Sequence, residues 1–320
     1  MGSRSAAASA PGKVILFGEH AVVYGEPSLS LALHRRIRVW GDVPADATTV
    51  NREALDEHRF SYIATALRLH WRDGHVRLRT ETELPQGGHV GSSAALSTAT
   101  IGVLFALQRG TPAPAADVAR AAFETEYATQ GAASPNDTTV ATAGGAVLLS
   151  PQREAGAEHL WRIEKGERAW NAHRITLPDL PLVVAHSGVR ARTADQVAKV
   201  KRFVDKNAFG RDLIQEIGAI TREGVEALKH RDLVRLGELM NRNHTCLHTL
   251  GVDAPALTRL VEAARRVPGT FGAKLTGAGG GGSLIALAER PQAVIEALQR
   301  MGAQAFPAEP SPRGLEVSVS

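Results

Sequence analysis

A glycine-rich turn that leads directly into a long apolar segment is the feature that most constrains this fold. Residues 85–95 read PQGGHVGSSAA, and residues 92–108 have the apolar pattern of a helix. Glycines let the backbone approach a ligand closely, and a helix N-terminus offers unpaired N–H groups and positive charge. The arrangement predicts an anion site suited to a triphosphate, although it is not a Walker A motif, because no Gly-Lys-Ser/Thr run follows. A ligand-free role for Ser92 and Ser93 as helix caps stays open.

The rest of the chain has the pattern of an α+β protein. Alternating runs such as 75–83 and helical runs such as 114–129 follow one another without a regular βαβ rhythm. With 320 residues, 43% of them hydrophobic, the chain is long enough for two domains. We place these domains at residues 1–180 and 181–320, and we interpret residues 1–10 as a flexible leader.

Charge and cysteine content narrow the choice of partners and compartment. The formal net charge is only +4, and no basic block, zinc-finger spacing or RNP-type aromatic motif is present, so nucleic acid is not an expected partner. A single cysteine, Cys246, excludes a disulfide within the chain and suits a reducing cytoplasm. No run reaches the roughly 18 apolar residues of a membrane helix. We therefore expect a cytoplasmic protein without a membrane partner.

One glutamate of the helix predicted at 114–129 lies on its apolar face. Ala122 and Phe123 belong to an apolar stripe that also includes Glu126. Glu124 points roughly the opposite way. A buried carboxylate is costly unless it is paired or bound to a metal, so Glu126 is the better candidate for a Mg²⁺ ligand. A salt bridge from Glu126 to a basic residue is the alternative.

An aspartate follows in a segment of small residues. Residues 131–145 read GAASPNDTTVATAGG, which we interpret as a turn followed by a strand from Val140. A carboxylate at Asp137 could accept or orient the proton of a hydroxyl group that receives a phosphoryl group. The residues from Ser134 to Asp137 also have the composition of a simple β-turn, which needs no substrate.

A second glycine-rich segment lies near the C-terminus. Residues 274–283 read KLTGAGGGGS and stand between two strand-like runs. Their glycine density predicts backbone that packs against a ligand or another loop. A dinucleotide-binding loop is a poor interpretation, because the run that follows, SLIALAE, is strand-like rather than helical.

Three segments together resemble a known family. PGKVILFGEHAVVYG (residues 11–25), PQGGHVGSSAA and KLTGAGGGG are similar, in order and spacing, to the three signature motifs of the GHMP kinases. The resemblance spans residue 11 to about 285. Within the superfamily, GEHAVVYG and SGVRARTADQVAKV (187–200) resemble the mevalonate kinases. Galactokinases continue their GEH with an Asp-Tyr pair, and phosphomevalonate kinases usually have Tyr where this chain has His20.

The resemblance implies a fold and a reaction. The fold is the two-domain GHMP kinase fold, with an N-terminal domain like domain 2 of ribosomal protein S5 and a ferredoxin-like C-terminal α/β sandwich. The active site lies in the cleft between them. The implied reaction is ATP-dependent phosphorylation of the C5 primary hydroxyl of mevalonate to 5-phosphomevalonate, in isoprenoid precursor biosynthesis. Mg²⁺ is the implied cofactor, mevalonate and ATP are the implied partners, and a homodimer is left open.

The resemblance also implies residue roles. Asp137 matches the catalytic aspartate, and Lys13 matches the lysine beside the acceptor hydroxyl and the phosphates. Ser93 and Glu126 match the Mg²⁺ ligands. The implied substrate-binding residues are Glu19, His20, Ser134 and Thr193. The implied ATP-phosphate loop consists of Pro85, Gly87, Gly88, His89, Val90, Gly91, Ser92, Ser93 and Ala94. The implied third-motif loop contains Gly277, Gly279, Gly280 and Gly281.

Two positions depart from the family pattern. His89-Val90 stand where Gly-Leu is usual, which adds bulk beside the phosphates, and Ser283 stands where a cysteine is frequent. The alternatives are another small-molecule kinase of the superfamily, a catalytically silent binding protein on the same fold, and a nucleic-acid-binding protein. The silent protein is disfavoured because the chain keeps all the reactive residues of the motifs, namely Lys13, Glu126 and Asp137.

Overall fold

The computed structural model describes residues 3–85, 88, 90–131 and 133–320. Its N-terminal part contains strands β1 (Arg4–Phe17), β2 (Ser28–Val43), β3 (Thr49–Val50), β4 (Glu53–Ala54), β5 (Arg77–Thr82), β6 (Ala146–Ser150), β7 (Glu158–Lys165) and β8 (Arg168–Ile175). The helices of this part are η1 (Ala21–Tyr24, a 3₁₀ turn), α1 (Ser61–His70), α2 (Ser92–Arg109), α3 (Ala115–Gln130) and α4 (Asn136–Ala143).

The C-terminal part begins with strand β9 (Leu182–His186) and ends with a strand that returns to the N-terminal part. Its further strands are β10 (Thr270–Thr276), β11 (Ser283–Ala288), β12 (Gln304–Pro307) and β13 (Glu316–Val319). Its helices are α5 (Thr193–Lys206), α6 (Ala208–Lys229), α7 (Leu233–Thr249), α8 (Pro255–Arg266) and α9 (Pro291–Arg300).

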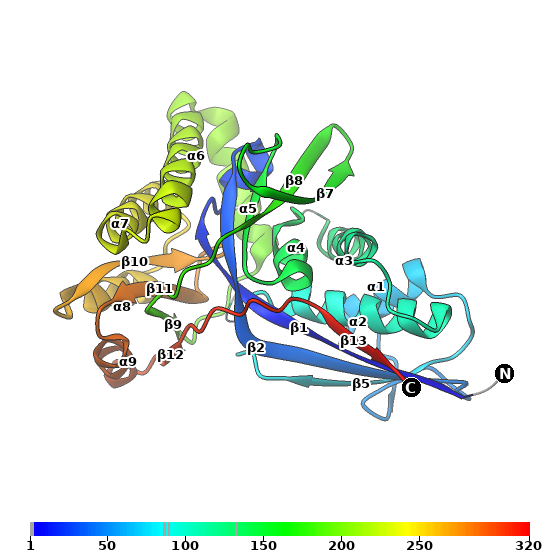
Figure 1. The fold of residues 1–320 in the computed structure, drawn as a ribbon. Coiled ribbons are helices and arrows are strands. Elements are labelled where there is room, and N and C mark those ends of the chain that lie inside the picture. The colour runs from blue at the N-terminus through cyan, green and yellow to red at the C-terminus, as the bar shows by residue number, and fades with distance from the viewer. Residues whose placement is uncertain (1–2, 86–87, 89, 132) are drawn as a thin grey trace.

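Two sheets organise these elements. The larger sheet has the order β4-β3-β5-β2-β6-β8-β7, and β1 pairs with both β2 and β13. The smaller sheet has the order β10-β11-β9-β12. Helices α2 to α4 pack on the larger sheet, and α1 packs against α2 and α3 (Figure 1). Helices α7 to α9 pack on the smaller sheet, whereas α6 packs on α7 and on β1 and β2. The predicted α+β class is therefore confirmed. We propose a domain boundary near residue 180, with the last strand returning to the first domain.

Residues 4–10 belong to strand β1, so the flexible leader predicted at residues 1–10 is wrong for the part that the structure describes. Ala6, Ala8 and Ala10 are buried on the face that α2 covers. Gly102 of α2 approaches so closely that a Cβ atom there would lie 3.3 Å from the Cβ of Ala8. The small side chains, which gave this segment the composition of a linker, allow the helix to pack tightly on β1.

A second correction concerns the segment after Pro135. We interpreted it as a turn and a strand, but it forms helix α4, and β6 begins only at Ala146. Its threonines favour strands in general. Here the Thr142 hydroxyl donates a hydrogen bond to the Thr138 carbonyl oxygen at 2.7 Å, one turn earlier in the helix. Packing of α4 on α2 and β1 outweighs the local preference.

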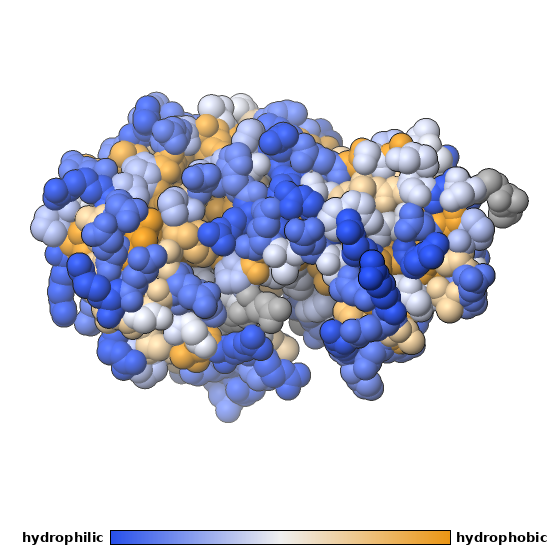
Figure 2. All heavy atoms as spheres, turned by 90° about the horizontal axis from the view of Figure 1, so that it is seen from below, coloured by the Kyte–Doolittle hydropathy of each residue, from blue (hydrophilic) through white to orange (hydrophobic). Residues whose placement is uncertain are grey.

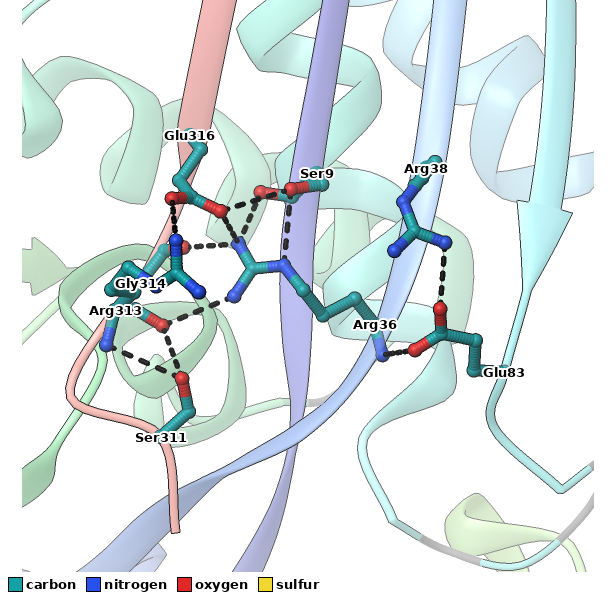
Figure 3. A network of polar contacts seen from close by, with 8 residues as sticks. All are labelled: Ser9, Arg36, Arg38, Glu83, Ser311, Arg313, Gly314 and Glu316. Atoms are coloured by element: carbon teal, nitrogen blue, oxygen red, sulfur yellow. Dashed lines mark hydrogen bonds and ion pairs between the residues drawn. The ribbon is translucent and has the colours of Figure 1, made fainter. Parts of the chain in front are cut away.

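The C-terminal segment is fastened to the larger sheet by Arg36, which lies at the centre of the network in Figure 3. Its guanidinium donates hydrogen bonds to the Ser9 carbonyl oxygen at 2.9 Å and the Arg313 carbonyl oxygen at 3.2 Å. It also lies 3.2 Å from the Glu316 carboxylate of β13. Arg36 is only 8% exposed. One buried cation thus satisfies backbone oxygens of β1 and of the segment that leads into β13.

The two halves meet at the end of β1. The Thr276 hydroxyl accepts a hydrogen bond from the Ile15 amide at 2.9 Å and donates one to the Ile15 carbonyl oxygen at 3.0 Å. These contacts lie where the register of β1 against β2 shifts. On α6, a Cβ atom at Gly224 would come within 2.4 Å of the Phe17 ring, so glycine is required for this helix to approach β1.

The surface has no single dominant character. On the face that Figure 2 shows, hydrophobic residues form small groups among hydrophilic ones. The large hydrophobic side chains that are exposed come from separate elements, such as Leu69 of α1 and Val234 of α7. Among the helices of the described residues, none has both the length and the apolar character needed to cross a membrane.

Candidate active site

A cavity of about 770 Å³ lies between the two halves. Its walls come from β1, η1 and helices α2 to α4 on one side, and from α5 and the loop after β10 on the other. The cavity brings together predicted residues from every motif, which are Lys13, Glu19, His20, Gly88, Gly91, Ser92, Ser93, Glu126, Ser134, Asp137, Thr193 and Gly277.

A lysine and an aspartate form an ion pair in the wall of this cavity. Lys13 Nζ lies 3.0 Å from Asp137 Oδ2, and the two side chains are 3% and 33% exposed. The Lys13 amide donates a hydrogen bond to the Val90 carbonyl oxygen at 2.8 Å, which joins β1 to the loop predicted to bind phosphate, called the phosphate loop below. Both residues line the cavity, and the Asp137 carboxylate is the more exposed of the two, so a hydroxyl group entering the cavity can reach it.

Asn136, which the sequence analysis missed, fixes the orientation of Asp137. Its Nδ2 donates to Asp137 Oδ1 at 2.9 Å. Its Oδ1 accepts from the hydroxyls of Ser28 at 2.8 Å and Ser30 at 3.2 Å, both on β2. Asn136 is 2% exposed, so the network is protected from water. The sequence pattern predicts a turn at this position, and a turn does not indicate that the Asn136 side chain faces β2.

The phosphate loop leads into α2 through a glycine with left-handed backbone. Gly91 is the N-cap of α2 with φ 77°, and a Cβ atom there would lie 2.8 Å from Lys13 Cγ. No side chain caps the helix, so the capping role left open for Ser92 and Ser93 is not observed. The first N–H groups of α2 have no partner within the helix.

Not all residues assigned to this loop line the cavity. Gly88, Gly91, Ser92 and Ser93 do, whereas Val90 and Ala94 are fully buried and Pro85 contacts Gly88 without lining the cavity itself. Gly87 and His89 fall outside the described residues.

The loop after β10 supports the site mainly through packing against other backbone. Gly277 lines the cavity, but Gly279, Gly280 and Gly281 do not. The Gly280 amide donates to the Val252 carbonyl oxygen at 2.6 Å, and a Cβ atom at Gly281 would lie 2.6 Å from the Val189 carbonyl oxygen. Ser283, two residues after Gly281, donates its hydroxyl to the Gly88 carbonyl oxygen and so connects this loop to the phosphate loop.

Glu126 is buried, as its position on the apolar stripe predicted. It is 5% exposed, whereas Glu124 is 45% exposed. Burial, and then the charge of Asp137, raise the pKa of Glu126 to about 8, while the Ser93 hydroxyl, Lys13 and Gln130 act in the opposite direction. Among the described residues Glu126 forms no ion pair within 4.0 Å, so the alternative of a salt bridge to a basic residue is not supported.

Two buried oxygen atoms near the start of α2 lack partners. Within the described part of the chain, neither Glu126 Oε1 nor Ser92 Oγ forms a hydrogen bond. No cluster of three or more His, Cys, Asp or Glu side chains among the described residues could hold a metal alone. Mg²⁺ usually takes one or two carboxylates together with substrate phosphates. The donor set therefore fits a Mg²⁺ ion that arrives with a nucleotide.

Gln130 and Tyr62 hold Glu126 in place and were not predicted. Gln130 Nε2 donates to Glu126 Oε2 at 3.2 Å and to the Tyr62 hydroxyl at 3.1 Å. Gln130 lies one helical turn after Glu126 on α3, and Tyr62 belongs to α1. The spacing of four residues could have suggested the first contact. The second depends on the packing of α1 against α3.

His20 is neutral and strained. Its backbone has φ 62° and ψ −41°, which is unusual for a residue with a side chain. Its Nε2 lies 3.0 Å from the Ala278 carbonyl oxygen and must donate there, which leaves Nδ1 as an acceptor. Burial lowers the pKa of His20 to about 4 despite this hydrogen bond. Nearby, Glu19 is 1% exposed and lines the same cavity.

The far end of the cavity is formed by residues that the sequence analysis did not select. The hairpin of β7 and β8 supplies Lys165, Arg168 and Trp170. Helix α5 supplies Lys201, which is paired with Asp205. Further lining residues here are Tyr24, Val22, Val23, Tyr127 and Val197. Nothing in the local sequence of the hairpin indicates that it folds over the cavity.

Comparison with known proteins agrees with this geometry. The model of the GHMP kinases N terminal domain matches residues 58–145, and that of the GHMP kinases C terminal matches residues 225–308. Together they cover more than half of the chain, which therefore belongs to the GHMP kinases.

Relatives narrow the assignment. The chain is 38% identical over 291 residues to a mevalonate kinase of Methanothermobacter thermautotrophicus, covering 87% of this chain and 89% of that protein. It is 32% identical to a mevalonate kinase of Pyrococcus furiosus over 97% of both chains. Within the GHMP kinases, the chain belongs to the mevalonate kinases. Its fold matches that of the L. major mevalonate kinase crystallised with R-mevalonate, with a TM-score of 0.76, 26% identity and coverage of 94% of this chain and 95% of that one.

Proposed function

We propose that this protein transfers the γ-phosphoryl group of ATP to the C5 primary hydroxyl of mevalonate, giving 5-phosphomevalonate and ADP for isoprenoid precursor synthesis. The observation that carries the proposal is the Lys13–Asp137 pair, which lies in a cavity also lined by the N-terminus of α2. A carboxylate for the acceptor hydroxyl and backbone donors for phosphate oxygens are the two requirements of such a transfer.

In the proposed reaction Asp137 accepts or orients the proton of the C5 hydroxyl, and Asn136 keeps the carboxylate turned toward it. Lys13 stabilises the negative charge of the attacking oxygen and of the transferred phosphoryl group. The unpaired N–H groups at the start of α2 bind phosphate oxygens. Most of the rate enhancement then comes from positioning and electrostatics, as in other phosphoryl transfers.

Glu126 and Ser93 are the proposed protein ligands of Mg²⁺. A bound Mg²⁺ would neutralise negative charge on the ATP phosphates. Glu126 Oε1 is available for this role because it lacks a hydrogen-bond partner among the described residues. Gln130 donates a hydrogen bond to the other carboxylate oxygen, Oε2, and so leaves Oε1 available for the metal.

The far end of the cavity supports a carboxylate-bearing substrate. Lys165 and Arg168 bring positive charge to it, and Arg168 forms no ion pair with another described residue. Trp170 and Val197 supply apolar surface for the methyl and methylene groups of mevalonate. Neutral His20 offers Nδ1 as a hydrogen-bond acceptor. We propose that the mevalonate carboxylate binds between Lys165 and Arg168.

The test is ADP release by the purified protein with mevalonate, galactose, homoserine or phosphomevalonate as the acceptor. We expect turnover with mevalonate and little or none with the other three. Turnover with one of those three and not with mevalonate would rule out the proposed substrate while leaving the kinase assignment intact. Binding of ATP without turnover of any acceptor would favour the silent binding protein.

Two further properties are proposed from the sequence. We propose a cytoplasmic location because one cysteine suits a reducing compartment, and a homodimer because of the family resemblance. Sedimentation of the purified chain would give its oligomeric state directly.

A further inference from the structure

A lysine without any exposure to solvent contacts the wall of the active site. Lys274 of β10 forms an ion pair with Glu19 Oε1, and the two side chains are 0% and 1% exposed. Glu19 follows β1, so the pair joins the two halves of the molecule beside the cavity. Buried ion pairs are often no more stabilising than apolar side chains of the same volume. The presence of this pair therefore points to a role other than stability.

The second oxygen of the same carboxylate is held by another element. Asn243 of α7, also 0% exposed, donates its Nδ2 to Glu19 Oε2 at 3.2 Å. Among the described residues, each carboxylate oxygen of Glu19 thus has one donor, and the donors come from β10 and α7, which pack on each other. Two fixed donors define the plane of the carboxylate. Each oxygen keeps a further lone pair that can accept a hydrogen bond from a molecule in the cavity.

The charges around Glu19 are balanced. Lys274 neutralises Glu19, just as Lys13 is paired with Asp137. An unpaired buried carboxylate would take up a proton, and it would also repel a negatively charged substrate. Lys274 supplies the opposite charge beside Glu19, and the oxygens of a carboxylate act as hydrogen-bond acceptors. Since Asp137 is engaged by the reacting hydroxyl, Glu19 is free for the other hydroxyl of the substrate.

We propose that Lys274 and Asn243 are positioning residues that hold Glu19 as the acceptor for the tertiary 3-hydroxyl of mevalonate. This inference rests on the proposed function and adds a source of specificity to it. A charge-assisted hydrogen bond to this hydroxyl makes the protein prefer mevalonate over 5-hydroxy-3-methylpentanoate, which lacks the 3-hydroxyl. We expect a preference of about ten- to a hundredfold in kcat/KM.

The experiment compares mevalonate and 5-hydroxy-3-methylpentanoate as phosphoryl acceptors in three variants. Lys274→Met/Glu19→Gln removes both buried charges together, so it is expected to fold with a Tm close to that of the wild type. Asn243→Ala removes only the second donor. Asn241→Ala is the matched control, because Asn241 Oδ1 accepts from the Ala273 amide at 3.1 Å and so links α7 to β10 without touching Glu19.

In the double variant and in Asn243→Ala, the KM for mevalonate should rise about tenfold or more and the preference over the deoxy substrate should shrink. The KM for ATP should not change. Asn241→Ala should keep the wild-type preference even if its Tm falls. A double variant and Asn243→Ala that both keep the wild-type preference would overturn the role of Lys274 and Asn243, with the proposed function unaffected. Wild-type protein that does not phosphorylate mevalonate would overturn both.

Discussion

Lys13 on β1 and Asp137 in the first turn of α4 face each other with 3.0 Å between Nζ and Oδ2, and each is fixed from behind by backbone or side-chain hydrogen bonds. The Lys13 amide is bound to the phosphate loop, and Asp137 is bound to Asn136. The position of the Asp137 carboxylate is therefore set by two strands of the larger sheet, β1 through Lys13 and β2 through Asn136. Its reactivity should depend on both.

Substitution of the carboxylate should stop the chemistry and spare binding. We expect Asp137→Asn to lower kcat by about 10²- to 10⁴-fold, because the amide can neither accept the proton nor pair with Lys13. Nucleotide affinity, measured by calorimetry, should change little. Asn136→Ala should lower kcat by a smaller factor, about tenfold to a hundredfold, because it only releases the carboxylate from β2. Wild-type rates in Asp137→Asn would remove this residue from the mechanism.

Loss of Gln130 should weaken metal binding. Gln130→Leu keeps the side-chain volume but removes the donor to Glu126 and to Tyr62. We expect the Mg²⁺ concentration needed for half-maximal nucleotide binding to rise about tenfold or more. Glu124→Gln on the same helix is the control, because that side chain is exposed. Equal Mg²⁺ dependence in both variants would show that Gln130 does not orient the ligand.

The stability of the protein without metal and nucleotide should depend on pH through Glu126. Its pKa is raised from 4.5 to about 8 in the folded state. Between these values the folded state keeps a proton that the unfolded state has lost, so stability falls as pH rises. His20 acts oppositely between pH 4 and 6.5, because the unfolded state holds the proton there. Of these two groups, only Glu126 changes the stability of the protein with pH above pH 6.5.

The measurement is Tm between pH 6.5 and 8.5 for the wild type and for Glu126→Gln. The wild type should lose stability relative to the variant across this range. Parallel curves would mean that Glu126 is already ionised in the folded protein at neutral pH.

Removal of Arg36 should destabilise the larger sheet. Arg36→Met leaves the carbonyl oxygens of Ser9 and Arg313 without this donor and removes the ion pair between Arg36 and Glu316 of β13. We expect a loss of roughly 2 kcal/mol in the free energy of unfolding by urea. Arg38→Met provides the comparison, because Arg38 and Glu83 form an exposed pair that should contribute at most about 1 kcal/mol. Similar losses of unfolding free energy in the two variants would contradict the proposal that Arg36 stabilises the contact between β1 and the C-terminal segment.

The sequence alone determined the features that depend on neighbours along the chain. Helical periodicity placed Glu126 on the buried face of α3 and Glu124 on the exposed face, and both positions are confirmed. The glycine-rich run before α2 likewise indicated a helix N-terminus, and Gly91 is its N-cap. These predictions succeed because the geometry of a single helix repeats at a fixed angle per residue.

Only the tertiary structure decided which distant segments meet. Asn136 reaches Asp137 and β2 at once, and Lys274 reaches Glu19 from the other half of the molecule. The hairpin that carries Arg168 lines the cavity although nothing in its own sequence indicates this position. Sheet pairing and helix packing bring these residues together, and that arrangement depends on the whole chain, because no local pattern records which strand lies beside which.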